Sequence, residues 1–334
     1  MTADRKVNWA IVGLGDIVRK RSGRAILDQP DSVLRACVTG DPIAKEADIE
    51  TLGPQKIYTN TDEMLADPDV DAVYLATPVF LHAPHAIAAL QAGKDVLVEK
   101  PMAMNVAEAR EMCLAADKAG RRLSVAYYRR FWPRFELVKD MLDRGGLGSV
   151  VAVRMALREW VSPAVGQAAA WRFIPRMSGG GVLLDVGSHR LDLLSWWFGL
   201  PRRLVARTET LTHDYPVEDS AAVLMILAGG AHFTGTFNWN SRVRGDEIQI
   251  IGTEAQMTLL PCDGPEVVIA AGSNVERRDM PKPSNLHYPL VDDFARAIIE
   301  DRPPRFSGAD GMKATQIIEA IFKSSRENAW VEVG

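Results

Sequence analysis

The side chains best suited to proton transfer fall together in one predicted helix. Asp185, His189 and Asp192 stand four and three positions apart. This spacing places all three on one helix face, where an acid can orient the ring of a histidine and raise its basicity. A capped helix with a histidine satisfied in the core fits the same spacing. A metal site is disfavoured, because the spacing indicates no third ligand.

Polar residues also follow two predicted strands. Thr77, Pro78 and His82 come after the strand at 72–76, and Glu99, Lys100 and Pro101 come after the strand at 95–98. Ligands of open parallel sheets bind beyond the carboxyl ends of the strands, so we expect both segments to face one crevice. Pro101 favours an extended conformation at Lys100, which would aim the lysine from a rigid strand end. The alternative for this lysine is a solvated loop charge.

A glycine-containing turn lies between a predicted strand at 7–12 and a predicted helix at 17–27. Its residues are Gly13, Leu14, Gly15, Asp16 and Ile17. Glycines in such a turn let a pyrophosphate approach the backbone N–H groups at the start of the helix. The turn therefore predicts a dinucleotide site. Val18 replaces the third glycine of that fingerprint, a position that serves packing.

The residues after the second predicted strand (33–38) bear on the choice of cofactor. Thr39 and Gly40 stand where an acidic side chain would bond the ribose 2′-hydroxyl of NAD. Asp41 comes later in the turn and could still reach that hydroxyl. Lys45 is either a partner for a 2′-phosphate or a surface lysine. The sequence therefore favours NADP, with NAD as the alternative.

The order of the predicted elements indicates two domains and an α/β class. Apolar runs alternate with amphipathic stretches over residues 1–125, which predicts a doubly wound parallel sheet covered by helices on both faces. Over residues 126–334 several strands follow one another without helices between them. That pattern predicts an α+β domain with a large, mostly antiparallel open sheet. A chain of 334 residues agrees with two cores.

Charge and cysteine content narrow the classes of partner. The formal net charge of −4 argues against nucleic acid or a membrane surface as the main partner. The apolar runs all fall short of the roughly 18 residues that a membrane span needs, and we expect no signal peptide. Cys37, Cys113 and Cys262 are far apart and lack metal-ligand spacing, so we expect reduced cysteines in a cytoplasmic protein.

Several motifs together resemble the glucose–fructose oxidoreductase and inositol dehydrogenase family. In chain order they are Gly13-Leu14-Gly15, Glu99-Lys100-Pro101, the segment from Tyr128 to Pro133, and Gly179-Gly180-Gly181 followed by Asp185, Gly187, His189 and Asp192. Trp171-Arg172 is similar to the anhydrofructose reductase branch, whose members use NADPH. Val18 and Ala44 depart from the usual residues of the family, and Ala44 leaves the choice of cofactor open.

The resemblance implies a Rossmann domain, then a domain whose open sheet often supports homodimers or homotetramers. It places Lys100, Asp185 and His189 around the substrate carbon and Trp171 and Arg172 near the nicotinamide. Thr39, Gly40, Thr77, Pro78, His82 and Glu99 complete the expected cofactor site with the glycine turn. Tyr128 and Arg172 are expected to contact a hydroxyl-rich substrate or to serve in packing.

We therefore predict an NAD(P)-dependent oxidoreductase that interconverts an alcohol and a carbonyl group on a sugar, anhydro-sugar or polyol. Lys100 would hold the reacting oxygen, His189 would exchange the proton and Asp185 would orient the imidazole, although Lys100 could equally donate the proton. A competing hypothesis is a non-catalytic dinucleotide sensor or co-regulator on the same fold. A third is a reductase of tetrapyrroles similar to biliverdin reductase.

Overall fold

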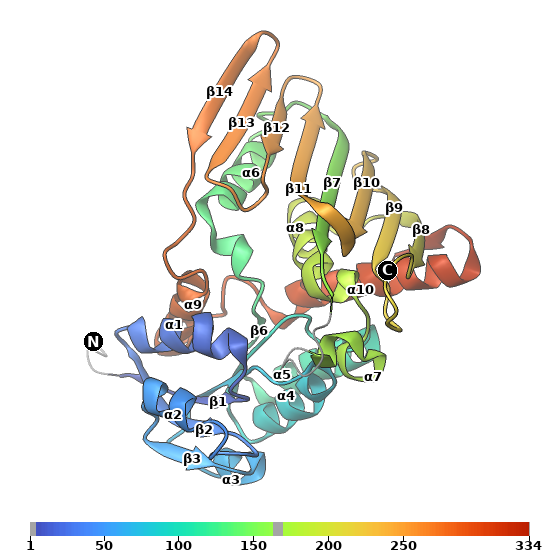
Figure 1. Cartoon of the computed structure of the whole chain (residues 1–334). Helices are drawn as coiled ribbons and strands as arrows, with labels where there is room; N and C mark the ends of the chain where they lie inside the picture. The colour runs from blue at the N-terminus through green and yellow to red at the C-terminus, as the bar shows by residue number, and fades with distance from the viewer. Residues whose placement is uncertain (1–4, 163–169, 334) are drawn as a thin grey trace. The chain divides into compact units, whose positions relative to one another are not determined.

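The chain folds into two units, each built on a sheet of its own (Figure 1). The computed structural model describes residues 5–162 and 170–333. The first unit comprises Met1–Tyr128 and Pro283–Met312, and the second comprises Arg129–Lys282 and Lys313–Gly334. The sequence pattern places the first border at residues 125 and 126 and leaves 283–312 in the second domain. This segment joins the first unit instead, where Phe294 packs on Trp9 with ring centroids 5.8 Å apart.

A parallel sheet forms the centre of the first unit. Within the described residues it has six strands: β1 (Val7–Val12), β2 (Ser32–Val38), β3 (Lys56–Tyr58), β4 (Ala72–Leu75), β5 (Asp95–Val98) and β6 (Leu123–Val125). Their order is β3-β2-β1-β4-β5-β6, and each neighbouring pair is parallel. The order reverses between β1 and β4, the switch point where such sheets bind dinucleotides. The predicted doubly wound sheet is confirmed.

The helices of the first unit pack on this sheet. They are α1 (Gly23–Asp28), α2 (Glu46–Leu52), α3 (Thr61–Leu65), α4 (His82–Gln91), α5 (Val106–Ala119) and α9 (Tyr288–Ile299). The helix expected at 17–27 contains a π-helical turn at Val18–Ser22 ahead of α1. Gly23 closes this turn by donating its N–H to the carbonyl of Val18, and a Cβ there would lie 2.8 Å from that oxygen. Turns of this kind are frequent at functional sites.

The second unit contains a larger sheet. In the described part of the chain it has nine strands: β7 (Val150–Trp160), β8 (Arg203–Glu209), β9 (Ser220–Ile226), β10 (His232–Asn238), β11 (Asn240–Gly252), β12 (Gln256–Leu259), β13 (Glu266–Ala271), β14 (Asn274–Asp279) and β15 (Val331–Glu332). Their order is β14-β13-β12-β11-β7-β10-β9-β8-β15. β7 and β10 are parallel and the other pairs are antiparallel, as the prediction of a mostly antiparallel sheet requires.

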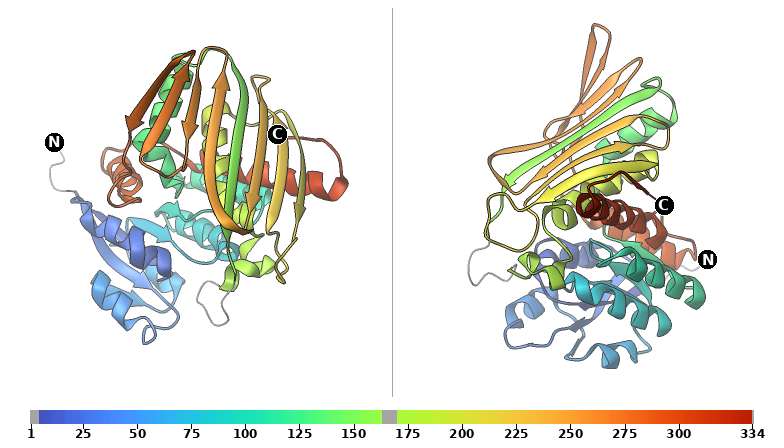
Figure 2. Two further views of the ribbon diagram at one scale, coloured as in Figure 1. Left: turned by 45° about the horizontal axis from the view of Figure 1, so that its top comes forward. Right: turned by 90° about the vertical axis from the view of Figure 1, so that its right-hand side faces the viewer.

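One face of this sheet is covered and the other is open (Figure 2). In β10, Phe233 and Phe237 are buried, whereas Thr234 and Thr236 are exposed. The helices of the unit are α6 (Pro133–Asp143), α7 (Pro175–Ser178), α8 (Ser188–Phe198) and the part of α10 (Gly308–Glu327) from residue 313 onward. The helix expected at 183–197 begins as a π-helix at Leu183–Gly187 and continues as α8. In the described ranges, the helices are all too short or too polar to cross a membrane.

Candidate active site

The carboxyl ends of β1, β4 and β5 bring the predicted residues of the first unit to one edge of its sheet. Val12 is in register with Leu75, and Leu75 is in register with Val98. The residues that follow these strands therefore lie side by side: the glycine turn, Thr77-Pro78, and Glu99-Lys100. This is the edge at which open parallel sheets bind ligands.

The geometry of the glycine turn fits a dinucleotide. Gly13 has a φ of +92°, and a Cβ on it would lie 2.9 Å from the carbonyl oxygen of Ala76. Gly15 and Gly40 have open space where a Cβ would stand, so a ligand can approach the main chain at both residues. Asp16 and Ile17 come directly before the π-helical turn, where N–H groups attract a phosphate.

His82 holds two of these strand ends together. Its Nε2 lies 2.9 Å from the carbonyl oxygen of Thr77, and its Nδ1 lies 2.9 Å from that of Pro101. The ring is 1% exposed, and burial lowers the pKa of His82 despite these two carbonyl contacts. The role of His82 in cofactor binding stays a prediction. Its ring connects the loop after β4 with the loop after β5, because one ring nitrogen contacts each of them.

Glu99 and Lys100 differ in where their side chains lie. Lys100 is half-buried, whereas the Glu99 carboxyl group is buried in the first unit. Oε1 of Glu99 accepts a hydrogen bond of 2.5 Å from the Tyr74 hydroxyl, and Oε2 accepts one of 3.2 Å from the Lys100 main-chain N–H. Burial favours the neutral acid, but His287 and Tyr74 outweigh it and hold the pKa of Glu99 below its usual range.

Asp185 and His189 lie on one helical stretch of the second unit, as predicted. Asp185 belongs to the π-helix, its side chain is 22% exposed, and Nη1 of Arg172 lies 3.8 Å from its Oδ2. His189 lies in the first turn of α8 and is 5% exposed. The guanidinium of Arg172 also lies over the Trp171 ring, 5.8 Å from its centroid. An arginine beside an accessible carboxylate is a suitable arrangement for binding hydroxyl or carbonyl oxygens.

Glu218 fixes the start of this helical stretch. Its two carboxylate oxygens accept hydrogen bonds from the N–H groups of Gly181 (2.7 Å) and Leu183 (3.0 Å). A Cβ on Gly181 would lie 2.1 Å from the main-chain oxygen of Glu218, so only glycine allows this approach. Burial raises the pKa of Glu218 to about 6 even though both main-chain bonds favour the charged form. The glycine run thus leaves room for the buried carboxylate of Glu218 to bond the main chain.

A second carboxyl group, that of Glu159, interacts electrostatically with Asp185. Glu159, at the end of β7, accepts a hydrogen bond of 3.1 Å from Nε1 of Trp239. Burial, and then the charge of Asp185, raise the pKa of Glu159 above its usual value. These two acids share one region of the second unit and would both accept hydrogen bonds from hydroxyl groups.

Asp192 does not belong with Asp185 and His189 in this chemistry. It forms a buried bidentate ion pair with Arg130, with its Oδ1 2.7 Å from Nη2 and its Oδ2 2.9 Å from Nε. Asp192 lies three positions after His189 within α8, so the two share a helix face, but the carboxylate of Asp192 is engaged by Arg130. Two other acidic residues lie beside Cys262 and also pair with arginines: Asp246 with Arg190, and Asp263 with Arg129.

Several residues of the candidate site were not predicted from sequence. They are Tyr74, Glu159, Glu218 and His287. Each is far along the chain from the residues that it contacts, so no local spacing reveals it. Tyr128, predicted to touch substrate, is 4% exposed, and its ring centroid lies 4.3 Å from that of His287. Its substrate role stays a prediction.

A doubly wound sheet with a glycine turn at its switch point is typical of dinucleotide-binding proteins. Residues 7–127 match the oxidoreductase family with an NAD-binding Rossmann fold, and residues 135–258 match the GFO/IDH/MocA C-terminal domain. The chain therefore belongs to the GFO/IDH/MocA family of oxidoreductases. The resemblance drawn from the motifs is confirmed.

Individual relatives match along almost the full chain. The 1,5-anhydro-D-fructose reductase of Ensifer adhaerens is 29% identical over 334 residues, covering 97% of this chain and 98% of that protein. The crystal structure of aldose-aldose oxidoreductase from Caulobacter crescentus with glycerol is 29% identical, has a TM-score of 0.89, and covers 98% of this chain and 100% of its own. Levoglucosan dehydrogenase with NADH and levoglucosan has a TM-score of 0.91 at 23% identity over 98% of this chain and 100% of its own, a likeness of fold.

Proposed function

We propose that this protein is an NAD(P)-dependent dehydrogenase or reductase that interconverts an alcohol and a carbonyl group on a sugar, anhydro-sugar or polyol. The observation that carries the proposal is the position of Lys100. It follows β5 at the edge where the glycine turn and Thr77-Pro78 also lie. Its main-chain N–H donates to the Glu99 carboxylate, and the His82 ring contacts the carbonyl oxygen of Pro101. A non-catalytic sensor has no need of a lysine held in this way.

The protein residues take distinct roles in the proposed reaction. Bound nicotinamide supplies hydride chemistry at the substrate carbon. Lys100 holds the reacting oxygen and stabilises negative charge that develops on it. His189 exchanges the hydroxyl proton as general acid/base, and Asp185 orients the imidazole or tunes its pKa. Lys100 remains the alternative proton donor, and Arg172, beside Asp185, is placed to hold the substrate.

The substrate class rests on chemistry and on the relatives together. The names of the relatives refer to an anhydro-ketose, to aldoses and to levoglucosan, all of them hydroxyl-rich. In the second unit, Glu159 and Asp185 offer carboxylate oxygens that accept hydrogen bonds from neighbouring hydroxyls. Both observations support a sugar or polyol as substrate.

We further propose that NADP is preferred over NAD. Thr39 and Gly40 stand directly after β2, and neither repels a 2′-phosphate. Asp41, the acid that could bond a ribose hydroxyl, accepts a hydrogen bond of 2.9 Å from the N–H of Ala44. Lys45 pairs with Asp48 at 3.5 Å and could turn to a phosphate. We expect kcat/KM to be higher with NADPH than with NADH. A higher kcat/KM with NADH, the cofactor bound in the levoglucosan dehydrogenase structure, would contradict this preference.

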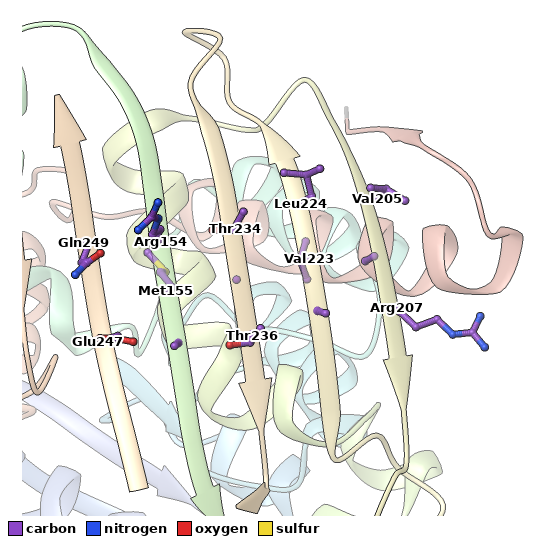
Figure 3. A pocket seen from close by; sticks show the side chains of 14 residues that line it. Arg154, Met155, Val205, Arg207, Val223, Leu224, Thr234, Thr236, Glu247 and Gln249 are labelled. Atoms are coloured by element: carbon purple, nitrogen blue, oxygen red, sulfur yellow. The ribbon is translucent and has the colours of Figure 1, made fainter. Parts of the chain in front are cut away.

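The open face of the second sheet supports a homodimer or homotetramer as the assembled state. A groove of about 690 Å³ lies on it, lined by Arg154, Leu224, Thr236 and Glu247 among others (Figure 3). Arg154 and Glu247 lie on adjacent strands, so a second copy related by a twofold axis would meet opposite charges. Light scattering should show Leu224→Asp shifted to a smaller species, with Leu211→Asp in an exposed loop as the control. Unchanged mass in both variants would refute this interface.

We place the protein in the cytoplasm, with no nucleic acid or membrane partner. The three cysteines support a reducing compartment, because Cys37 and Cys262 are buried and all three are free. The net charge of −4 supports a small-molecule ligand in preference to a polyanion. Fractionation of cells that express the protein is the direct check.

The enzyme is tested by the absorbance of reduced nicotinamide across a panel of sugars, polyols, ketoses and anhydro-sugars with NADP(H) and NAD(H). Lys100→Met and His189→Ala should each lower kcat by about 100-fold or more, the usual scale for such groups. Lys118→Met and His232→Ala, both at exposed positions, are the matched controls. Silence across the panel, with both reduced cofactors still quenching tryptophan emission, would favour the sensor.

A further inference from the structure

A buried polar cluster lies behind Lys100 in the first unit. Its members are Tyr74, Glu99, Tyr128 and His287, and none is more than 6% exposed. His287 comes from the segment Pro283–Met312, which returns to the first unit after the chain has completed most of the second. The cluster therefore joins residues that are far apart in the sequence.

His287 is held firmly in this cluster. Its main-chain N–H donates to Oδ1 of Asn285 at 3.0 Å, and Nδ2 of Asn285 donates to the carbonyl of Arg21 at 3.1 Å. Its ring packs on Tyr128, whose hydroxyl accepts from Nη1 of Arg21 at 3.2 Å. On the other side, Nε2 of His287 lies 3.4 Å from Oε1 of Glu99.

Glu99 transmits this contact to Lys100. Oε1 of Glu99 faces His287 and Tyr74, while Oε2 accepts from the Lys100 main-chain N–H. A buried carboxylate is costly unless charge or hydrogen bonds compensate it. Removal of the imidazole would leave Oε1 with the Tyr74 hydroxyl, and Glu99 would then protonate or rotate. Either change alters the bond that fixes the main chain at Lys100.

We propose that His287 is a positioning residue for Lys100 and acts through the Glu99 carboxylate. This inference rests on the role proposed above for Lys100. His82 contacts the carbonyl oxygen of the following residue, Pro101, so two histidines act on the main chain around Lys100, one directly and one through Glu99. A small displacement of a catalytic group suffices for large losses in rate, because reacting atoms must be held in narrow geometry.

Two polar substitutions of different reach test this proposal. In His287→Gln the amide nitrogen can stand near the position of Nε2, whereas in His287→Asn the side chain ends short of Glu99. We expect kcat of His287→Asn to fall by about 10- to 100-fold, and His287→Gln to keep most of the wild-type rate. The dissociation constant of reduced cofactor should stay near the wild-type value in both. His85→Asn, a half-buried histidine of the same unit, is the control.

A double-mutant cycle shows whether the effect passes through Glu99. In a Glu99→Gln background, His287→Asn should lower kcat by much less than it does alone, because both changes break one connection. Equal kcat in the Asn and Gln variants, or additive losses in the cycle, would overturn the proposal.

A readout without substrate separates this inference from the proposed function. Acetylation of Lys100 in the cofactor-free protein, followed by peptide mass spectrometry, should be several-fold faster in His287→Asn than in wild type. Lys118, which is exposed on α5, should be labelled at an unchanged rate. Faster Lys100 labelling in a protein without turnover would refute the proposed function alone. Unchanged Lys100 labelling would refute the role of His287.

Discussion

The buried carboxyl group of Glu218 links the stability of the second unit to pH. Its pKa is raised from 4.5 to about 6, with burial as the largest cause. Between these two values the folded protein keeps a proton that the unfolded chain has lost. Stability from this group is therefore fully present below about pH 4.5 and is lost as pH rises through about 6. A shift of 1.5 units corresponds to about 2 kcal/mol.

The substitution Glu218→Gln removes this titration. We expect the free energy of unfolding of the wild type, relative to the variant, to fall by about 2 kcal/mol from about pH 4.5 to about pH 7.5. The variant also loses a hydrogen bond at every pH. Its amide has one oxygen, which can accept from only one of the N–H groups of Gly181 and Leu183, and this lowers its free energy of unfolding by about 1–3 kcal/mol.

Urea unfolding followed by tryptophan emission measures both effects. The variant Glu254→Gln, at an exposed position, controls for the loss of one carboxylate. A difference between wild type and Glu218→Gln that stays constant across this pH range, or that grows in favour of the wild type as pH rises, would refute the reasoning.

Four further perturbations have defined outcomes. Gly181→Ala should lower the midpoint of thermal unfolding far more than Gly229→Ala, because a Cβ meets Glu218 at the first position and open space at the second; equal midpoints would contradict the packing. Arg130→Met should cost about 3–5 kcal/mol of unfolding free energy by leaving Asp192 buried without its partner, and a cost under about 1 kcal/mol would show that the pair is dispensable. Gly13→Ala should abolish quenching of tryptophan emission by reduced cofactor, whereas Gly53→Ala, also at positive φ but away from the turn, should retain it. Burial raises the pKa of Cys37 to about 12, so this thiol should react with a disulfide reagent at pH 8 only on unfolding; rapid labelling of Cys37 in the native protein would contradict its burial.

The bounds of the strands that end at the candidate cofactor site could be predicted from the sequence with little error. β1 and β5 have the predicted bounds, and β4 differs by one residue, because each is a short apolar run closed by a turn signal. Strands without such a pattern could not be found. β14 reads Asn-Val-Glu-Arg-Arg-Asp and lies at an exposed sheet edge, where no face needs apolar side chains. β3 is three residues long and largely exposed.

The parts of the site that sequence could supply are those set by local spacing. Asp185 and His189 fall on one helical stretch because they are close in the chain, and Lys100 follows a strand that its own residues define. The sequence did not reveal the π-helix at Leu183–Gly187, which alters the spacing between Asp185 and the residues of α8, or the pairing of Asp192 with the buried Arg130. Glu218 binds N–H groups at the start of this helical stretch from a distant loop, a contact that no local pattern reveals.

Three side chains of the candidate site have one physical property in common. His82 faces two carbonyl oxygens, and Glu99 and Glu218 accept from main-chain N–H groups. All three hold backbone, so they fix the main chain around Lys100 and at the start of the helical stretch with Asp185. Because these side chains bond main-chain groups, they can position the same backbone whatever residues face the substrate. We therefore expect substitutions at Glu159 or Arg172 to change substrate preference while leaving the labelling rate of Lys100 unaltered, whereas substitutions at His82 or Glu99 change that labelling rate.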